Sequence, residues 1–218
     1  MKIAVFGTGE VGRRIGKKLV DAGHEVMLGS RTAGNEKAVA WAAEAGPRAS
    51  QGTFADAAAG AELVFNCTSG AASLAVIESA GANNLAGKIL VDVSNPLDFS
   101  NGFPPSLSVC NTESLAERIQ AALPDTKVVK TLNTMANPVM VDPGSIRDGE
   151  HDVFVSGNDE GAKATVTALL QKDFGWKRVI DLGDITTARG TEAWLLLWTR
   201  LYAALGTADF NLAIVRKG

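Results

Sequence analysis

The feature that most constrains this chain is a glycine-rich turn close to its N-terminus. An apolar run, Ile3–Phe6, leads directly into Gly7-Thr8-Gly9-Glu10-Val11-Gly12, and a helix-like segment follows. In a GxGxxG turn between a strand and a helix, the first glycine permits the tight turn and the second lets the backbone approach a pyrophosphate. The third lets helix and strand pack closely, and the helix N-terminus points N–H groups at the phosphates. The sequence therefore predicts a dinucleotide site at residues 7–12.

Short apolar runs alternate with helix-like segments along most of the chain. The expected strands are Ile3–Phe6, Glu25–Leu28, Glu62–Cys67, Lys88–Val93, Lys127–Leu132, Asp152–Ser156 and Arg178–Leu182. The expected helices are Val11–Ala22, Glu36–Ala45, Ala71–Ala82, Glu113–Leu123 and Glu160–Lys172. Strands that are apolar throughout suit a parallel sheet covered on both faces. We therefore expect an α/β protein with a doubly wound (Rossmann) parallel sheet over residues 1–156 and a small C-terminal extension, a strand and an apolar helix, over residues 157–218.

The C-terminal stretch Thr191–Val215 is apolar on nearly every helical face, so a helix there needs to be buried all round. Two arrangements satisfy this requirement. The helix packs across the edge of its own sheet, or it forms the interface of a homodimer, since exposed aromatic stretches usually mark interfaces.

Composition excludes several classes of protein. The net charge of −3 lacks the basic excess of a nucleic-acid binder. The longest apolar run near the C-terminus, Ala193–Trp198, is far shorter than the ~20 residues of a membrane span. Two cysteines, Cys67 and Cys110, form neither a disulfide framework nor a zinc pattern. We expect a cytoplasmic protein without a metal site, a nucleic-acid partner or a membrane anchor.

The end of the second strand indicates which dinucleotide binds. An NAD enzyme would be expected to place a carboxylate there for the ribose hydroxyls, but this chain reads Gly29-Ser30-Arg31-Thr32. The Arg31 guanidinium pairs well with a phosphate, Ser30 adds a hydrogen bond, and Lys37 lies within reach. The sequence therefore predicts NADP(H).

Few residues could act as a proton donor to a carbonyl substrate. His24 is expected in a turn, His151 in a polar loop and Tyr202 in the C-terminal helix, with no Tyr-x-x-x-Lys pattern. We expect structural roles for all three. Cys67 ends a strand near the expected nicotinamide, where it is either a nucleophile or a buried strand thiol.

Three polar, uncharged segments follow later strands, and ligands of doubly wound folds bind at the carboxyl ends of parallel strands. They are Asn66-Cys67-Thr68-Ser69-Gly70, Ser94-Asn95-Pro96-Leu97 and Asn133-Thr134-Met135-Ala136-Asn137-Pro138. Together these segments would form a polar wall that can orient a nicotinamide and a planar partner but offers little acid–base chemistry. It suits hydride transfer between two cofactors. Each segment is also compatible with an ordinary βα turn whose Asn or Ser caps a helix.

These residues resemble the NADPH-dependent reductases of the deazaflavin coenzyme F420, a family related to the ferric-reductase domain of the STEAP membrane proteins. The resemblance covers almost the whole chain and includes MKIAVFGTGEVG, GHEVMLGSR, DVSNPL, VVKTLNTM, VSGND and DLGDITTARGTEAWLLLW. It implies NADPH on the glycine loop, a deazaflavin or flavin against the nicotinamide, and a dimer. The sequence departs from the family at Asn133, where F420 reductases tend to carry His.

Carried over by position, the resemblance divides the candidate residues between two halves of the site. The expected NADP(H) contacts are Gly7, Thr8, Gly9, Glu10, Val11, Gly12, Ser30, Arg31, Lys37 and Thr68. The expected nicotinamide and acceptor pocket comprises Thr68, Ser69, Ser94, Asn95, Pro96, Asn133 and Met135.

Three functions therefore stay open. The first is hydride transfer between NADPH and F420 or a flavin. The second is NADPH-dependent reduction of a small imine, carbonyl or metal chelate, which needs an acid that the sequence does not reveal, unless a bound water donates the proton. The third is a non-enzymatic NADPH sensor that signals through the C-terminal helix.

Overall fold

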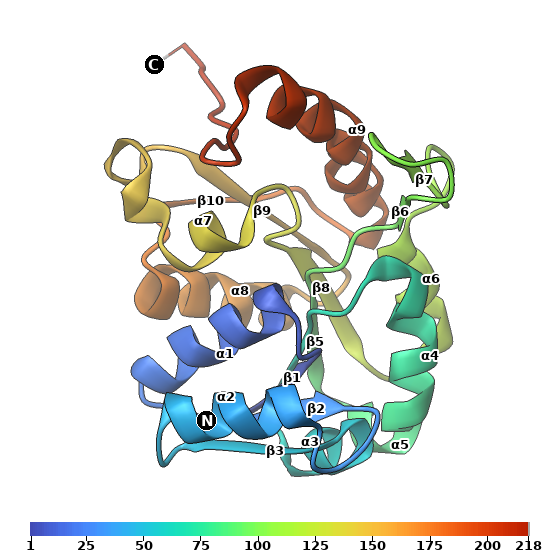
Figure 1. Ribbon diagram of the computed structural model, residues 1–218. Helices are drawn as coiled ribbons and strands as arrows, with labels where there is room; N and C mark the ends of the chain where they lie inside the picture. The colour runs from blue at the N-terminus through green and yellow to red at the C-terminus, as the bar shows by residue number, and fades with distance from the viewer. Residues whose placement is uncertain (218) are drawn as a thin grey trace.

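In the computed structural model, which describes residues 1–217, eight strands form one sheet. They are β1 (Lys2–Phe6), β2 (Glu25–Ser30), β3 (Ala49–Thr53), β4 (Leu63–Asn66), β5 (Ile89–Asp92), β8 (Lys127–Thr131), β9 (Asp152–Gly157) and β10 (Arg178–Asp181). Their spatial order is β10-β9-β8-β5-β4-β1-β2-β3, and the order reverses between β1 and β4 (Figure 1). This is the strand order of a doubly wound fold, so the predicted fold class is confirmed.

One junction of the sheet differs from the prediction of parallel strands throughout. Strand β9 pairs antiparallel with β8, with Val129 opposite Gly157 and Thr131 opposite Val155, whereas β10 runs parallel to β9. The connection after β8 holds only the five-residue helix α7 (Asn137–Val141) and the 3-10 turns η1 (Pro143–Ser145) and η2 (Arg147–Gly149). The chain therefore enters β9 at the same end of the sheet at which it left β8, and the two strands run in opposite directions. Apolar periodicity reports that a strand is buried but carries no information on its direction.

Helices cover both faces of the sheet and enclose two hydrophobic cores. Helices α1 (Glu10–Asp21), α2 (Glu36–Ala45), α7 and α8 (Glu160–Leu169) pack on one face, and α8 continues as the π-helical turn η3 (Leu170–Phe174). Helices α3 (Phe54–Gly60), α4 (Gly70–Ala80), α5 (Ala82–Leu85) and α6 (Leu115–Ala122) pack on the other (Figure 1). Alternate residues of one strand point to opposite cores: Val5 belongs to the first and Phe6 to the second.

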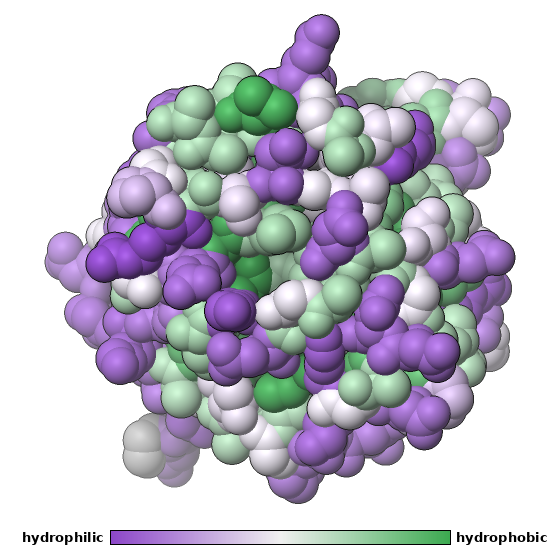
Figure 2. Space-filling view, turned by 90° about the horizontal axis from the view of Figure 1, so that it is seen from below, coloured by the Kyte–Doolittle hydropathy of each residue, from purple (hydrophilic) through white to green (hydrophobic). Residues whose placement is uncertain are grey.

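Strand β3 and helix α3 were missed by the sequence analysis. Strand β3 reads Ala-Ser-Gln-Gly-Thr and lies at the sheet edge, where one of its five residues is buried, so it shows no apolar run. Figure 2 views the molecule from this side, and there hydrophilic and hydrophobic residues are interspersed.

The C-terminal helix α9 (Ala188–Leu205) follows the 3-10 turn η4 (Ile185–Thr187) and lies above the sheet beside the hairpin of β6 (Leu97–Asp98) and β7 (Ser106–Leu107) (Figure 1). The prediction of a helical stretch to Val215 is wrong beyond Leu205, because Gly206 takes the left-handed conformation with φ 68° and ends the helix. Burial is also one-sided. Leu195 is buried, whereas Leu197 and Leu205 are 53% and 57% exposed. Among residues 1–217, no helix is long and apolar enough to span a membrane.

Candidate functional site

The three glycines of the turn differ in what surrounds them. Gly7 has φ +113°, and a Cβ atom there would lie 2.9 Å from the carbonyl oxygen of Cys67. A Cβ on Gly12 would overlap the carbonyl oxygen of Gly7. Around Gly9, by contrast, a Cβ would meet no atom within 4 Å. Gly7 and Gly12 are therefore required by the fold itself, whereas the space beside Gly9 is open, as the approach of a pyrophosphate requires.

Two adjoining pockets lie along the carboxyl ends of the parallel strands. The larger, of about 760 Å³, is within the range of small-molecule sites. The smaller, of about 300 Å³, lies beside the glycine turn. Thr68 and Ser69 line both pockets, so one continuous surface leads from the end of β2 to the end of β8. An extended ligand such as a dinucleotide can occupy this surface.

The smaller pocket brings together the residues expected around a 2′-phosphate. Gly7, Thr8, Ser30 and Arg31 line it, and Lys37 does not. The Ser30 hydroxyl donates to the carbonyl oxygen of Thr32 at 2.7 Å, and the exposed Arg31 forms no ion pair within the described chain. An exposed guanidinium without a carboxylate partner fits the additional phosphate of NADP(H).

One residue of this smaller pocket, Asn35, was not predicted from the sequence. Asn35 lines it, and its side-chain oxygen accepts from the backbone N–H groups of Lys37 and Ala38 at 3.1 and 3.2 Å. Asn35 therefore caps the N-terminus of α2 at the pocket wall. An Asn immediately before an amphipathic segment is the signal that would have predicted this cap.

The larger pocket gathers most of the residues predicted around the nicotinamide. Thr68 and Ser69 follow β4, Ser94 and Asn95 follow β5, and Asn133 and Met135 follow β8, and all six line the pocket. Pro96 and Glu10 line neither pocket. Pro96 is buried, and its carbonyl oxygen accepts from Ser108 N at 2.8 Å; Glu10 is exposed and pairs with Arg13.

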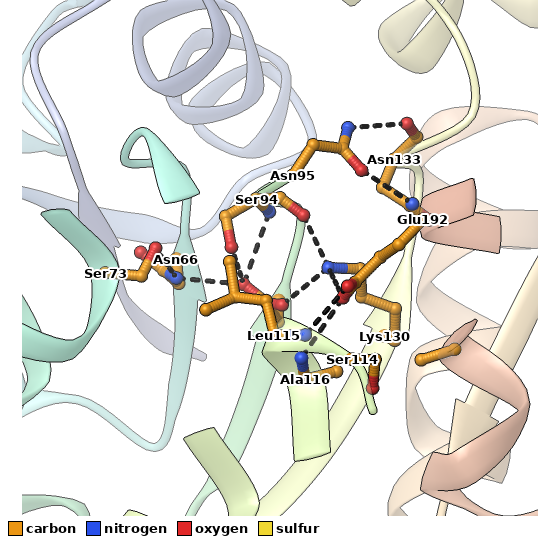
Figure 3. Close-up of polar contacts among 12 residues, drawn as sticks. Asn66, Ser73, Ser94, Asn95, Ser114, Leu115, Ala116, Lys130, Asn133 and Glu192 are labelled. Atoms are coloured by element: carbon orange, nitrogen blue, oxygen red, sulfur yellow. Dashed lines mark hydrogen bonds and ion pairs between the residues drawn. The ribbon is translucent and has the colours of Figure 1, made fainter. Parts of the chain in front are cut away.

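Hydrogen bonds fix the polar wall of the larger pocket. The Thr68 hydroxyl donates to the side-chain oxygen of Asn66 at 2.7 Å. Asn95 and Asn133 form a reciprocal pair: Asn95 Nδ2 donates to the Asn133 carbonyl oxygen at 2.8 Å, and Asn133 Nδ2 donates to Asn95 Oδ1 at 2.9 Å (Figure 3). Asn133 Nδ2 also donates to the carbonyl oxygen of Thr191 in α9 at 3.1 Å.

A buried charge cluster beneath this wall was not predicted. Lys130 of β8 is 1% exposed and contacts Asp92 of β5 and Glu192 of α9, each at 2.8 Å (Figure 3). Burial alone lowers the pKa of a lysine, but here the two carboxylates outweigh it and raise the pKa of Lys130. The cluster could have been suspected from charged residues inside otherwise apolar elements, VVKTL, LVDV and TEAWLLL.

The histidines and the tyrosine lie outside the larger pocket. His24 contacts Asp173 at 2.9 Å. His151 lies in a loop, as expected, but is buried, and it contacts the carbonyl oxygen of Pro143 at 2.9 Å. Tyr202 stacks on Trp198 with ring centroids 5.6 Å apart. These contacts agree with the expected structural roles.

Two titratable groups do line the pocket. Burial raises the pKa of the Cys67 thiol well above its ordinary value, so the thiolate that nucleophilic catalysis requires does not form at neutral pH. Hydrogen bonds from the Ser100 backbone and side chain lower the pKa of Asp98, so this carboxylate is ionised and cannot act as an acid. In the described part of the chain, no three His, Cys, Asp or Glu residues are grouped to hold a metal ion.

Comparisons with known proteins agree with this geometry. The family described as NADP oxidoreductase coenzyme F420-dependent matches residues 2–96. The F420-dependent NADP reductase of Methanothermobacter marburgensis is 32% identical over 204 residues, which cover 88% of both chains. A solved structure from Arthrobacter sp. FB24, assigned as an F420-dependent NADP reductase, is 57% identical with a TM-score of 0.94 and covers 99% of this chain and 100% of its own.

A second curated relative matches the same share of this chain. Metalloreductase STEAP3 of Rattus norvegicus is 32% identical over 198 residues, which are 88% of this chain. The chain spans only about a third of that relative, 36% of its length.

Proposed function

Because this chain belongs to the family of F420-dependent NADP oxidoreductases, we propose that it transfers hydride between NADP(H) and a deazaflavin of the F420 type. The chain is an NADP-dependent oxidoreductase, and the proposal concerns its acceptor. The observation that carries it is the lining of the larger pocket, which is wide, mostly apolar and polar only through amides and hydroxyls, apart from Cys67 and the ionised Asp98. When bound, the nicotinamide supplies the hydride, and the deazaflavin takes it up together with a proton from solvent.

The residues of the chain bind and orient the two partners. Arg31 pairs with the 2′-phosphate beside Ser30, whose hydroxyl donates to Thr32, and the turn at residues 7–12 receives the pyrophosphate at the N-terminus of α1. Asn95 and Asn133 orient the planar groups in the larger pocket. Met135 and Trp198 line the same pocket and give it apolar surface for these groups.

The pocket chemistry favours this reaction over reduction of an imine or carbonyl. Such a substrate needs a proton donor within hydrogen-bond reach of the atom that becomes charged. Cys67 is a half-buried thiol of raised pKa and Asp98 is ionised, so near neutral pH neither supplies a proton and a bound water would have to do so.

The test is NADPH oxidation by the purified protein with F420, with FMN and without acceptor, repeated with NADH. We expect turnover with NADPH and F420 and little with NADH. Turnover with FMN but not with F420 would show that the acceptor is a flavin and not a deazaflavin. Tight NADPH binding without turnover of either acceptor would refute the proposed reaction and favour the sensor.

The exposed side of α9 supports a second part of the proposal, a homodimer. Leu196, Leu197, Tyr202 and Leu205 are 44%, 53%, 41% and 57% exposed on this helix. Light scattering after gel filtration should give twice the chain mass, and L197D should shift it to the monomer. L74D is the matched control, since Leu74 is 39% exposed on α4. A monomeric wild-type protein would refute the dimer.

A further inference from the structure

The buried cluster around Lys130 is the centre of a closed ring of contacts. Lys130 Nζ donates to Asp92 Oδ2 at 2.8 Å and to the Ser94 carbonyl oxygen, and it contacts Glu192 Oε1 at 2.8 Å (Figure 3). These three acceptors use all the N–H groups of the ammonium. The ammonium is therefore fully paired, and the two carboxylates leave one buried negative charge in excess.

The ring passes from Lys130 through the pocket wall and returns through α9. Ser94 precedes Asn95, which pairs with Asn133. Asn133 donates to the carbonyl oxygen of Thr191, and the next residue, Glu192, contacts Lys130. The side-chain amides of Asn95 and Asn133 are thus held by the same lysine from two sides.

Ser94 is held at all of its polar groups. Its backbone N–H and its hydroxyl donate to Asp92 Oδ1 at 3.2 and 2.7 Å, and its carbonyl oxygen accepts from Lys130. Asp92 Oδ1 also accepts from Asn66 Nδ2 at 2.8 Å, which joins the Thr68 side of the pocket to the same carboxylate. A shift of Lys130 would therefore move both sides of the wall.

Glu192 fixes α9 to the rest of the ring. Its carboxylate accepts from the backbone N–H groups of Leu115 and Ala116 at 2.7 and 3.1 Å, at the N-terminus of α6 (Figure 3). The positive end of that helix dipole offsets the second buried negative charge. Leu195, one turn further along α9, lines the pocket.

The backbone between Lys130 and Asn133 is strained. Leu132 is buried, with 1% of its surface exposed, and has φ +61°, a conformation uncommon for residues other than glycine. Such strain persists only where the surroundings hold it, and it is frequent at ligand sites. The ring bonds on either side of Leu132 supply that restraint.

We propose that Lys130 is a positioning residue for the nicotinamide end of the site: with Asp92 and Glu192 it fixes the Asn95–Asn133 pair and fastens it to α9. This inference rests on the proposed placement of the nicotinamide and its acceptor in the larger pocket. Lys130 itself does not line the pocket, so it acts through Ser94 and Asn133.

The chain contains a matched control. Lys163 of α8 is also buried and also contacts two carboxylates, Glu160 at 2.8 Å and Asp181 at 2.9 Å. Asp181 ends β10, which runs antiparallel to β8. This cluster therefore lies at the amino ends of the parallel strands, whereas the pocket lies at their carboxyl ends. K163M removes a buried, paired ammonium without touching the pocket wall.

The experiment compares two ligands in wild type, K130M, K130R and K163M. One is NADPH, and the other is adenosine 2′,5′-bisphosphate, which has the 2′-phosphate half but no nicotinamide. We expect K130M to weaken NADPH binding about tenfold, the order of one or two lost hydrogen bonds, and to leave the affinity for the bisphosphate unchanged. With an accepted hydride acceptor, kcat should fall about 100-fold through misplacement of the reacting groups. K130R, which retains the charge, should recover part of both losses, and K163M should lower Tm without changing the affinity ratio.

A second variant covers the case in which K130M does not fold. E192Q keeps the volume and the Lys130–Asp92 pair but weakens the link to α9, and it should lower the NADPH affinity in the same direction. If E192Q and any folded Lys130 variant lose only Tm, with the NADPH-to-bisphosphate ratio of wild type, the positioning role is wrong. If no acceptor is turned over but the ratio changes as expected, the proposed reaction fails and the positioning role stands.

Discussion

Replacement of Arg31 by alanine tests the NADP(H) site directly. Arg31 follows β2, lines the smaller pocket and has no carboxylate partner in the described chain, so its removal leaves no unpaired charge in the protein. A hydrogen bond to a charged group contributes about 1.5–3 kcal/mol, and an exposed side chain lies at the lower end because water and salt weaken the contact. A loss of about 1.5 kcal/mol raises the NADPH Kd about tenfold. NADH lacks the 2′-phosphate, so its Kd should hardly change.

Titration of intrinsic fluorescence or calorimetry with NADPH, NADH and adenosine 2′,5′-bisphosphate measures this difference. R48A is the control, because Arg48 is also exposed but precedes β3, at the amino ends of the parallel strands, whereas Arg31 follows β2 at their carboxyl ends. The NADPH preference of the wild type should shrink as salt rises, since exposed charges are screened over about 8 Å at physiological ionic strength. Equal losses of NADPH and NADH affinity in R31A would refute the assignment, as would the same loss in R48A.

Two further predictions follow from the glycine turn and from the thiols. G9A should fold with the wild-type Tm but lose NADPH affinity, because a Cβ there meets only the open space of the site. G12A should unfold at a markedly lower temperature, because its Cβ overlaps the carbonyl oxygen of Gly7. Equal Tm values for both variants would contradict this. Burial raises the pKa of Cys67, so Ellman's reagent at pH 8 should modify only the exposed Cys110 in the folded protein and both thiols after denaturation. Rapid reaction of both thiols in the folded protein would show that Cys67 forms a thiolate.

Local patterns predicted the elements that carry their own signal. The turn at residues 7–12 and the central strands are recognisable because buried parallel strands are apolar throughout. Strand β3 lacked that signal because it lies at the edge, and the direction of β9 lacked it because apolar runs are the same in either direction. The C-terminal helix was overextended because the apolar residues continue past Gly206, whose left-handed conformation ends it.

Much of the candidate site was predictable for a topological reason. Segments that follow β4, β5 and β8 are far apart in the sequence, but parallel strands place their carboxyl ends at one sheet edge, so Thr68, Asn95 and Asn133 meet around one pocket. Pro96 does not line the pocket, and its contact with the ligands stays a prediction. It follows the same strand but is buried beside the pocket wall.

The ion cluster shows where this kind of prediction ends. The position of Lys130 inside an apolar strand indicates that it is buried, and a buried lysine needs partners of opposite charge. Asp92 is a predictable partner, because it occupies the facing position on the neighbouring strand β5. Glu192 is not a predictable partner, because α9 follows two further strands, β9 and β10, before it packs against Lys130. Partners on neighbouring strands follow from the strand order, whereas a partner on a later helix depends on tertiary packing that local patterns do not encode.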